Sequence, residues 1–136
     1  MKPLVSILIP AYNAEKWIGY TLQSAVNQTW PVKEIIVVDD GSRDRTAEVA
    51  RGFASKNVKI VSTENRGLSG AVNNAYKLCQ GEYIQELDAD DLLSPDKIER
   101  QLLALQEIRN RRILASSPWA PFYFRANRAR FIPNSL

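Results

Sequence analysis

The sequence of 136 residues contains no histidine, one methionine and one cysteine. The lack of histidine excludes catalytic triads and metal sites built on imidazole, which leaves oxygen ligands as the available metal chemistry. Cys79 cannot form a disulfide within the chain, and we expect a small buried apolar side chain there rather than a nucleophile. No apolar run approaches the roughly 20 residues of a membrane span, and a signal-peptide pattern is absent. We therefore expect a cytoplasmic location, and the cytoplasmic face of a membrane stays open for a longer protein.

Aspartate and glutamate are also missing after Glu107, where six arginines follow. The formal net charge of +3 therefore comes from this last segment. A basic tail can bind nucleic acid. Here the arginines alternate with Trp119, Phe122, Tyr123 and other large apolar residues, which is typical of an interior segment of a larger domain. We therefore expect no nucleic-acid partner.

The rest of the chain alternates between predicted strands and helices. Strands are predicted at residues 4–9, 34–38, 58–61, 83–87 and 112–116, and helices at 14–28, 44–56, 69–78 and from Ser94 onward, with Gly81 as a helix-ending glycine. The near-continuous apolar strand at 34–38 is typical of a sheet covered on both faces. This order predicts an α/β fold with a mostly parallel, Rossmann-like sheet flanked by helices.

Four polar loops follow the first four predicted strands, at residues 10–13, 39–42, 63–67 and 88–91. Ligands of parallel sheets bind outside the carboxyl ends of the strands, so we expect these loops to share one ligand-binding edge. The first loop lacks the G-x-G-x-x-G pattern, which excludes an ordinary dinucleotide-binding fingerprint.

Asp88, Asp90 and Asp91 place three carboxylates within four positions of the last of these loops. Like charges so close repel one another unless a cation lies among them. The cluster is either a site for a divalent metal that holds a diphosphate, or an acidic turn before the next helix. The loop alone leaves both interpretations open.

Taken together, four motifs resemble glycosyltransferase family 2. They lie at residues 5–13, 36–42, 65–69 with Asn73, and 87–91. The resemblance implies a GT-A fold, here truncated, and transfer of a sugar from a nucleotide-diphosphate donor, expected to be a UDP-sugar, to an acceptor hydroxyl with inversion. It also implies that residues 1–117 are the nucleotide-sugar-binding half and residues 118–136 the start of an incomplete acceptor-side half.

The resemblance also implies roles for single residues. Nucleotide-binding residues would be Pro10, Ala11, Tyr12, Asn13, Asp40, Arg66 and Asp88. Asp40 would accept a hydrogen bond from the base, and Asp90, helped by Asp88, would coordinate Mn²⁺ or Mg²⁺ on the diphosphate. The residues themselves also allow plainer roles: Asp40 in a turn with Gly41, Asn13 as a helix cap, and Arg66 as a solvated charge. We expect Asp91 to be structural.

The sequence departs from the family pattern at Glu86, which interrupts the fourth strand, and at Val72, where arginine is common. A buried, unpaired Glu86 would be costly, so we expect either a basic partner or exposure. The general base of inverting members follows the acidic motif, and no carboxylate follows Glu107 here. We therefore expect the base beyond Leu136, no catalytic residue in this chain, and a fragment that binds donor but transfers poorly.

Three rival functions remain open on the sequence alone. A non-catalytic nucleotide-binding module on the same fold would bind donor without a base. A nucleotidyltransferase would need a glycine-rich basic loop after the first strand, and residues 10–13 are not one. A nucleic-acid-binding protein would depend on the arginines of the tail and lose affinity steeply with salt. The acceptor is not predicted.

Overall fold

The computed structural model describes residues 1–106 and residue 115. The elements in chain order are β1 (Val5–Ala11), α1 (Ile18–Val26), β2 (Lys33–Asp39), α2 (Thr46–Arg51), β3 (Val58–Ser62), α3 (Gly67–Leu78), β4 (Tyr83–Glu86) and α4 (Lys97–Gln106). Residues 1–98 form one compact unit, which carries the sheet. The expected strand at 112–116, the domain boundary after residue 117 and the arginine-rich tail lie outside the described residues. No helix in the described part of the chain is long and apolar enough to cross a membrane.

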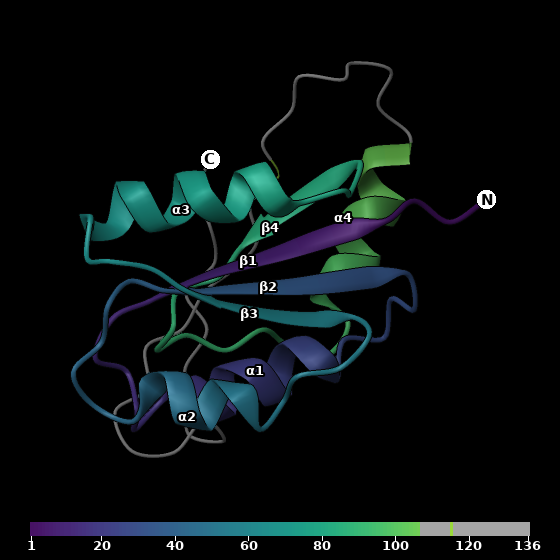
Figure 1. The fold of residues 1–136 in the computed structure, drawn as a ribbon. Coiled ribbons are helices and arrows are strands. Elements are labelled where there is room, and N and C mark those ends of the chain that lie inside the picture. Colours follow the sequence, from purple (N-terminus) through teal and green to yellow (C-terminus); the bar gives the residue numbers. More distant parts are fainter. Residues whose placement is uncertain (107–114, 116–136) are drawn as a thin grey trace, which may run out of the picture. The chain divides into compact units, whose positions relative to one another are not determined.

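The four strands form one parallel sheet in the order β3-β2-β1-β4. From β1 the chain winds outward through β2 to β3, and then returns to place β4 on the other side of β1 (Figure 1). The winding direction therefore reverses between β1 and β4. In open α/β sheets such a switch point, at the carboxyl ends of the strands, is where ligands bind. The predicted α/β fold with a parallel sheet is confirmed.

Helices cover both faces of this sheet, with α3 on one face and α1 and α2 on the other (Figure 1). Under α3 the core joins Leu8, Ile36 and Val38 of the strands to Ala71 and Ala75 of the helix. The two alanines let the helix backbone approach the sheet closely. All seven residues of β1 are buried, as expected for a strand covered on both faces. Cys79 packs against this core, as predicted for a small apolar side chain, but it is half-buried rather than buried.

β4 is less buried than β1 and β2. It lies at the edge of the described sheet, where Tyr83 and Ile84 are 39% and 42% exposed. Glu86 is also exposed, which confirms the second of the two alternatives predicted for it, a basic partner or exposure. The polar residue in this strand therefore avoids the cost of burial without needing a basic partner.

Gly81 does not end a helix as predicted, because α3 ends at Leu78 and the next residue is already extended. Glycine is required at position 81 because the backbone there lies close to Ser6 of β1. A Cβ on Gly81 would lie 2.6 Å from both the backbone nitrogen and Oγ of Ser6. The N–H of Gly81 donates to that Oγ, and the Ser6 hydroxyl donates in turn to Glu34. These contacts join the start of β4 to β1 and β2.

Candidate functional site

The loop after β1 is tied to the loop after β2 by reciprocal hydrogen bonds. Asn13 has a positive φ of 48°, its N–H donates to Oγ of Ser42, and its side-chain oxygen accepts from the N–H of Arg43. Ala14 N–H donates to Oγ1 of Thr46, which is fully buried. Asn13 therefore joins two loops, and it is not the N-cap of α1, which begins at Ile18 after Trp17.

Asp44 supports the same junction. Burial alone raises the pKa of this carboxyl, but hydrogen bonds from the Thr46 side chain and from the N–H groups of Thr46 and Glu15 outweigh it, and the net pKa is lowered. Asp44 therefore stays ionised and keeps these donors in place. Asp44 and Thr46 were not among the predicted site residues, although an acid two residues before a threonine at a helix start is a recognisable turn signal.

Asp40 connects three of the four loops. Its N–H donates to the carbonyl of Ala11 at 2.8 Å, and its Oδ1 accepts from the N–H of Arg66 at 2.8 Å. The side chain is 3% exposed, and its second oxygen accepts no hydrogen bond from the described residues. One carboxylate oxygen thus holds the third loop while the other is left for a ligand. Gly41 follows with φ +70°, which lets the turn pass against the backbone of Asn65.

A cavity of about 290 Å³ opens where these loops meet. It is lined by Pro10, Ala11, Tyr12, Asp40, Asn65, Gly67, Leu68 and Ala71. Tyr12 is 49% exposed, so its ring is accessible to a ligand. The structure thus brings together four of the predicted nucleotide-binding residues, and adds Asn65 and Leu68, which the prediction did not include. Asn13, Arg66, Asp88 and Asp90 do not line this cavity.

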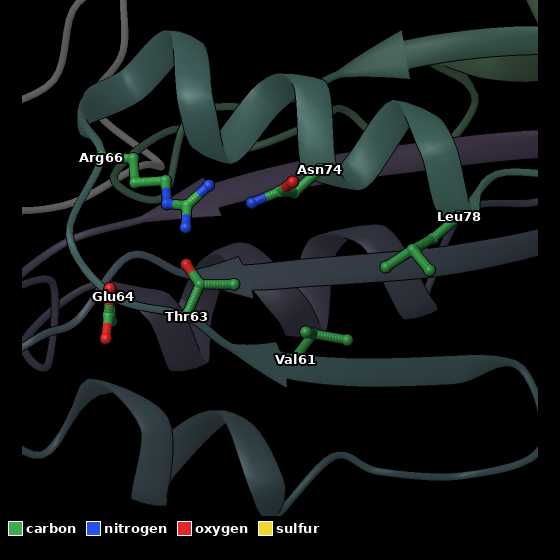
Figure 2. A pocket seen from close by; sticks show the side chains of 6 residues that line it. All are labelled: Val61, Thr63, Glu64, Arg66, Asn74 and Leu78. Carbon is green, nitrogen blue, oxygen red and sulfur yellow. The ribbon is translucent and has the colours of Figure 1, made fainter.

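The side chain of Arg66 lies in a second cavity, of about 490 Å³, on the other side of the loop at residues 63–67. Figure 2 shows its guanidinium directed toward the amide of Asn74 and the hydroxyl of Thr63. Only the backbone N–H of Arg66 reaches Asp40. Its assignment to the nucleotide therefore stays a prediction.

The acidic loop after β4 is exposed at its carboxylates and anchored at its centre. Asp88, Asp90 and Asp91 are all exposed, whereas Ala89 between them is buried. The buried hydroxyl of Thr21 in α1 donates to the carbonyl of Ala89 at 2.8 Å. Burial, followed by the charges of Asp88 and Asp90, raises the pKa of Asp91. The loop is thus fixed by its backbone while its like charges crowd together.

Polar side chains of α1 and of the segment directly after it continue this anchoring along the chain that leads to α4. Ser24 Oγ accepts from the N–H of Leu93. Gln28 is 4% exposed, donates to the carbonyl of Ser94 and accepts from the N–H of Ile98. Together with Thr21 they recur at intervals of three and four residues, a pattern that is visible in the sequence but was not part of the predicted site.

The acidic loop is suited to a divalent cation, although not as a closed protein cage. Within residues 1–106 no three carboxylate or thiol side chains come close enough to hold a metal ion. Mg²⁺ and similar ions need only one or two protein carboxylates when phosphate oxygens and waters complete the shell. The crowded charges of Asp88, Asp90 and Asp91 fit a bound cation on this ground.

The family model of glycosyl transferase family 2 matches residues 6–127. Chondroitin synthase of Escherichia coli is 44% identical over 109 residues, which cover 79% of this chain and 16% of that protein.

Two solved structures share the fold at 30% sequence identity. S. aureus TarS 1-349 in complex with UDP-GlcNAc has a TM-score of 0.71 and is matched over 76% of this chain and 31% of its own. The mannosyltransferase PcManGT from Pyrobaculum calidifontis, in complex with GDP-Man and Mn²⁺, has a TM-score of 0.72 over 77% of this chain and 33% of its own. The chain therefore spans about a third or less of each of these relatives.

Proposed function

The chain belongs to glycosyl transferase family 2 and carries the parallel-sheet part of a GT-A fold, and from this we propose that it binds a UDP-sugar for transfer to an acceptor hydroxyl with inversion. The observation that carries the proposal is the smaller cavity. It gathers Pro10, Ala11, Tyr12 and Asp40 at the carboxyl ends of β1 and β2, as the family resemblance predicted for the nucleotide.

The chemistry of this cavity favours uracil. The second oxygen of Asp40 can accept from a ring N–H, which uracil, thymine and guanine possess and cytosine and adenine lack. The amide of Asn65 can donate to an adjacent carbonyl, and the ring of Tyr12 offers a stacking face. The cavity of about 290 Å³ has room for a base ring.

Asp90 and Asp88 are proposed to hold Mn²⁺ or Mg²⁺. When bound, such an ion supplies Lewis-acid neutralisation of the charge that develops on the diphosphate leaving group. The two carboxylates are exposed after β4, on the other side of the switch point from the base cavity. The role of Thr21 is then to hold the backbone of this loop in position through its hydrogen bond to the Ala89 carbonyl. The Mn²⁺ in the PcManGT complex supports the same metal chemistry.

Transfer to the acceptor requires a general base on the attacking hydroxyl, within about 2.6–3.2 Å of it. The sequence has no carboxylate after Glu107, and the chain covers about a third of the two solved relatives. We therefore propose that these 136 residues hold the donor side of the site and that the isolated chain transfers sugar poorly. Robust transfer by the isolated chain contradicts this part of the proposal.

The base assignment can be tested by calorimetric titration of UDP and CDP against the chain and its Asp40→Asn variant. The wild type should bind UDP at least about tenfold more tightly, since one charge-assisted hydrogen bond contributes about 1.5–3 kcal/mol. In Asp40→Asn the side-chain oxygen can still hold the Arg66 N–H, and the amide then presents a donor to the base. UDP should lose affinity and CDP should gain it, and an unchanged ratio of the two affinities would refute the assignment.

The metal assignment can be tested by thermal unfolding with UDP, with and without Mn²⁺. Ligands that bind only the folded state raise its stability, so UDP with Mn²⁺ should give the larger shift in Tm. Asp90→Asn should abolish the contribution of Mn²⁺. The matched control is Asp91→Asn, an exposed carboxylate one residue away, which should retain it. The assignment fails if Asp90→Asn keeps the full metal-dependent shift.

A further inference from the structure

The larger cavity is separate from the proposed nucleotide site. It lies between α3 and β3, measures about 490 Å³ and is lined by Val61, Thr63, Glu64, Arg66, Asn74 and Leu78 (Figure 2). None of these residues lines the smaller cavity. The loop at residues 63–67 divides the two, because Asn65 and Gly67 line one side while Glu64 and Arg66 line the other. Its volume lies in the range of about 300–1,000 Å³ that is typical of small-molecule sites.

One polar group in this cavity is buried without a partner. Oγ1 of Thr63 is inaccessible to solvent and has no hydrogen-bond partner among the described residues. A buried hydroxyl that makes no hydrogen bond destabilises a folded protein, and native structures contain few of them. Figure 2 shows this hydroxyl directed at the same space as the Arg66 guanidinium. Because this oxygen has no exposed surface, a ligand reaches it only by displacing the side-chain atoms that cover it, and would then supply the missing partner.

Arg66, which is exposed, and Asn74, which is half-buried, add side-chain donors to the same space. Neither side chain makes an ion pair or a hydrogen bond within the part of the chain that the structure describes. Glu64 is the carboxylate of the lining, and its side chain is turned away from the guanidinium (Figure 2). A guanidinium presents planar, paired donors that match the oxygens of a carboxylate or a phosphate. Val61 and Leu78 close the other end of the cavity with apolar surface.

We propose that this cavity binds a small oxyanion carried on a hydroxylated carbon skeleton, such as a sugar phosphate or a sugar carboxylate. Arg66 takes the anionic group, with the Thr63 hydroxyl and the Asn74 amide as additional donors. Val61 and Leu78 contact the carbon skeleton, and Glu64 at the rim accepts from a ligand hydroxyl. The site is independent of the nucleotide cavity, so it stands whether or not UDP binds there.

The test is thermal unfolding of the 136-residue chain without nucleotide, titrated with glucose 6-phosphate, glucuronate, inorganic phosphate and glucose. One of the two charged sugars should raise Tm saturably, and which of them does so distinguishes phosphate from carboxylate as the source of the anion. Inorganic phosphate should bind more weakly, and glucose should give no shift. No saturable shift with either charged sugar overturns the proposal. Equal binding of glucose overturns the oxyanion, and equal binding of inorganic phosphate overturns the sugar.

Variants show whether the ligand occupies this cavity. Thr63→Val and Asn74→Leu should each weaken binding about tenfold or more, because each loses a hydrogen bond to the ligand. The control is Asn73→Leu, the same change at an exposed side chain that does not line the cavity. Thr63→Val removes the unpaired hydroxyl and should keep or raise the Tm of the ligand-free protein, so lost binding cannot reflect unfolding. Equal affinities in all three variants would place the ligand elsewhere and overturn the proposal.

Discussion

Gly41 is the position at which a single methyl group should separate two of the loops that build the smaller cavity. Its φ is +70°, and a Cβ there would lie 2.8 Å from the backbone nitrogen of Asn65 and 3.2 Å from the carbonyl oxygen of Thr63. Both atoms belong to the backbone, so no side-chain rotation can relieve the contact. The left-handed conformation costs a non-glycine residue about 1–2 kcal/mol. Crowding a packed site adds about 1–3 kcal/mol, so Gly41→Ala should lose about 2–5 kcal/mol in free energy of unfolding.

Gly67 provides a matched control for the contact. Its φ of +78° is nearly the same, but a Cβ there would meet nothing within 4 Å. Gly67→Ala should therefore lose only the conformational part, about 1–2 kcal/mol. The difference between the two variants isolates the approach of the turn at residues 39–42 to the loop at residues 63–67.

Urea unfolding followed by far-ultraviolet circular dichroism measures both free energies in the same buffer. Single domains have about 5–15 kcal/mol in total, so the predicted loss in Gly41→Ala is a large share and shifts the midpoint clearly. The reasoning is refuted if the two variants lose the same free energy, because the contact with Asn65 then contributes nothing to the need for glycine at position 41.

Three further predictions concern the contacts that hold the site in place. Gly81→Ala should lose about 3 kcal/mol in urea unfolding, because its Cβ would lie 2.6 Å from Ser6, and a loss under about 1 kcal/mol would contradict the close approach. Thr21→Val leaves the carbonyl of Ala89 without its donor, and calorimetry should show Mn²⁺-dependent UDP binding weakened about tenfold with metal-free binding unchanged. Equal losses with and without metal would speak against that role. Thr46→Val should lose about 1–3 kcal/mol in free energy of unfolding, because it leaves the N–H of Ala14 without its acceptor. Thr46→Ser keeps the hydroxyl and should retain most of the stability. Equal losses in the two variants would be inconsistent with the hydrogen bond.

The apolar strands and the ligand-binding edge were predictable because each depends on a local pattern. The continuous apolar run at residues 35–38, and the segment at residues 5–9 that is apolar except for Ser6, are typical of a sheet covered on both faces, and both are buried in β1 and β2. Parallel pairing then brings the loops after these strands to one edge. The exposure of Tyr83 and Ile84 in β4 was not predictable, because sequence does not tell which strand lies at the edge of the described sheet.

The use of individual polar side chains was predictable only in part. Asn13, Asp40 and Arg66 all lie in the predicted loops, but each makes its hydrogen bonds to a partner about 26 to 30 residues away in sequence. Such partners depend on how two loops approach one another, and a motif within one loop contains no information on that approach. The direction of the Arg66 side chain, into the larger cavity, has the same cause.

The loop at residues 63–67 explains why Arg66 does not line the smaller cavity, although its motif predicts that it binds the nucleotide. Residues 64–67 line the two cavities alternately, so adjacent residues of one motif have different surroundings. Asn65 and Gly67 line the smaller cavity, and Glu64 and Arg66 line the larger. The backbone is fixed by two hydrogen bonds, from the N–H of Thr63 to the carbonyl of Asp39 and from the N–H of Arg66 to the Asp40 side chain, and Asp40 itself lines the smaller cavity. A ligand in the larger cavity would accept from the Arg66 guanidinium, and a base in the smaller cavity would donate to Asp40, which holds the backbone N–H of Arg66. The two ligands would therefore contact Arg66 at its side chain and, through Asp40, at its backbone. One oxygen of the Asp40 carboxylate holds the N–H of Arg66, and the other is left to accept from the base. The loop at residues 63–67 can therefore keep its position while both cavities are filled.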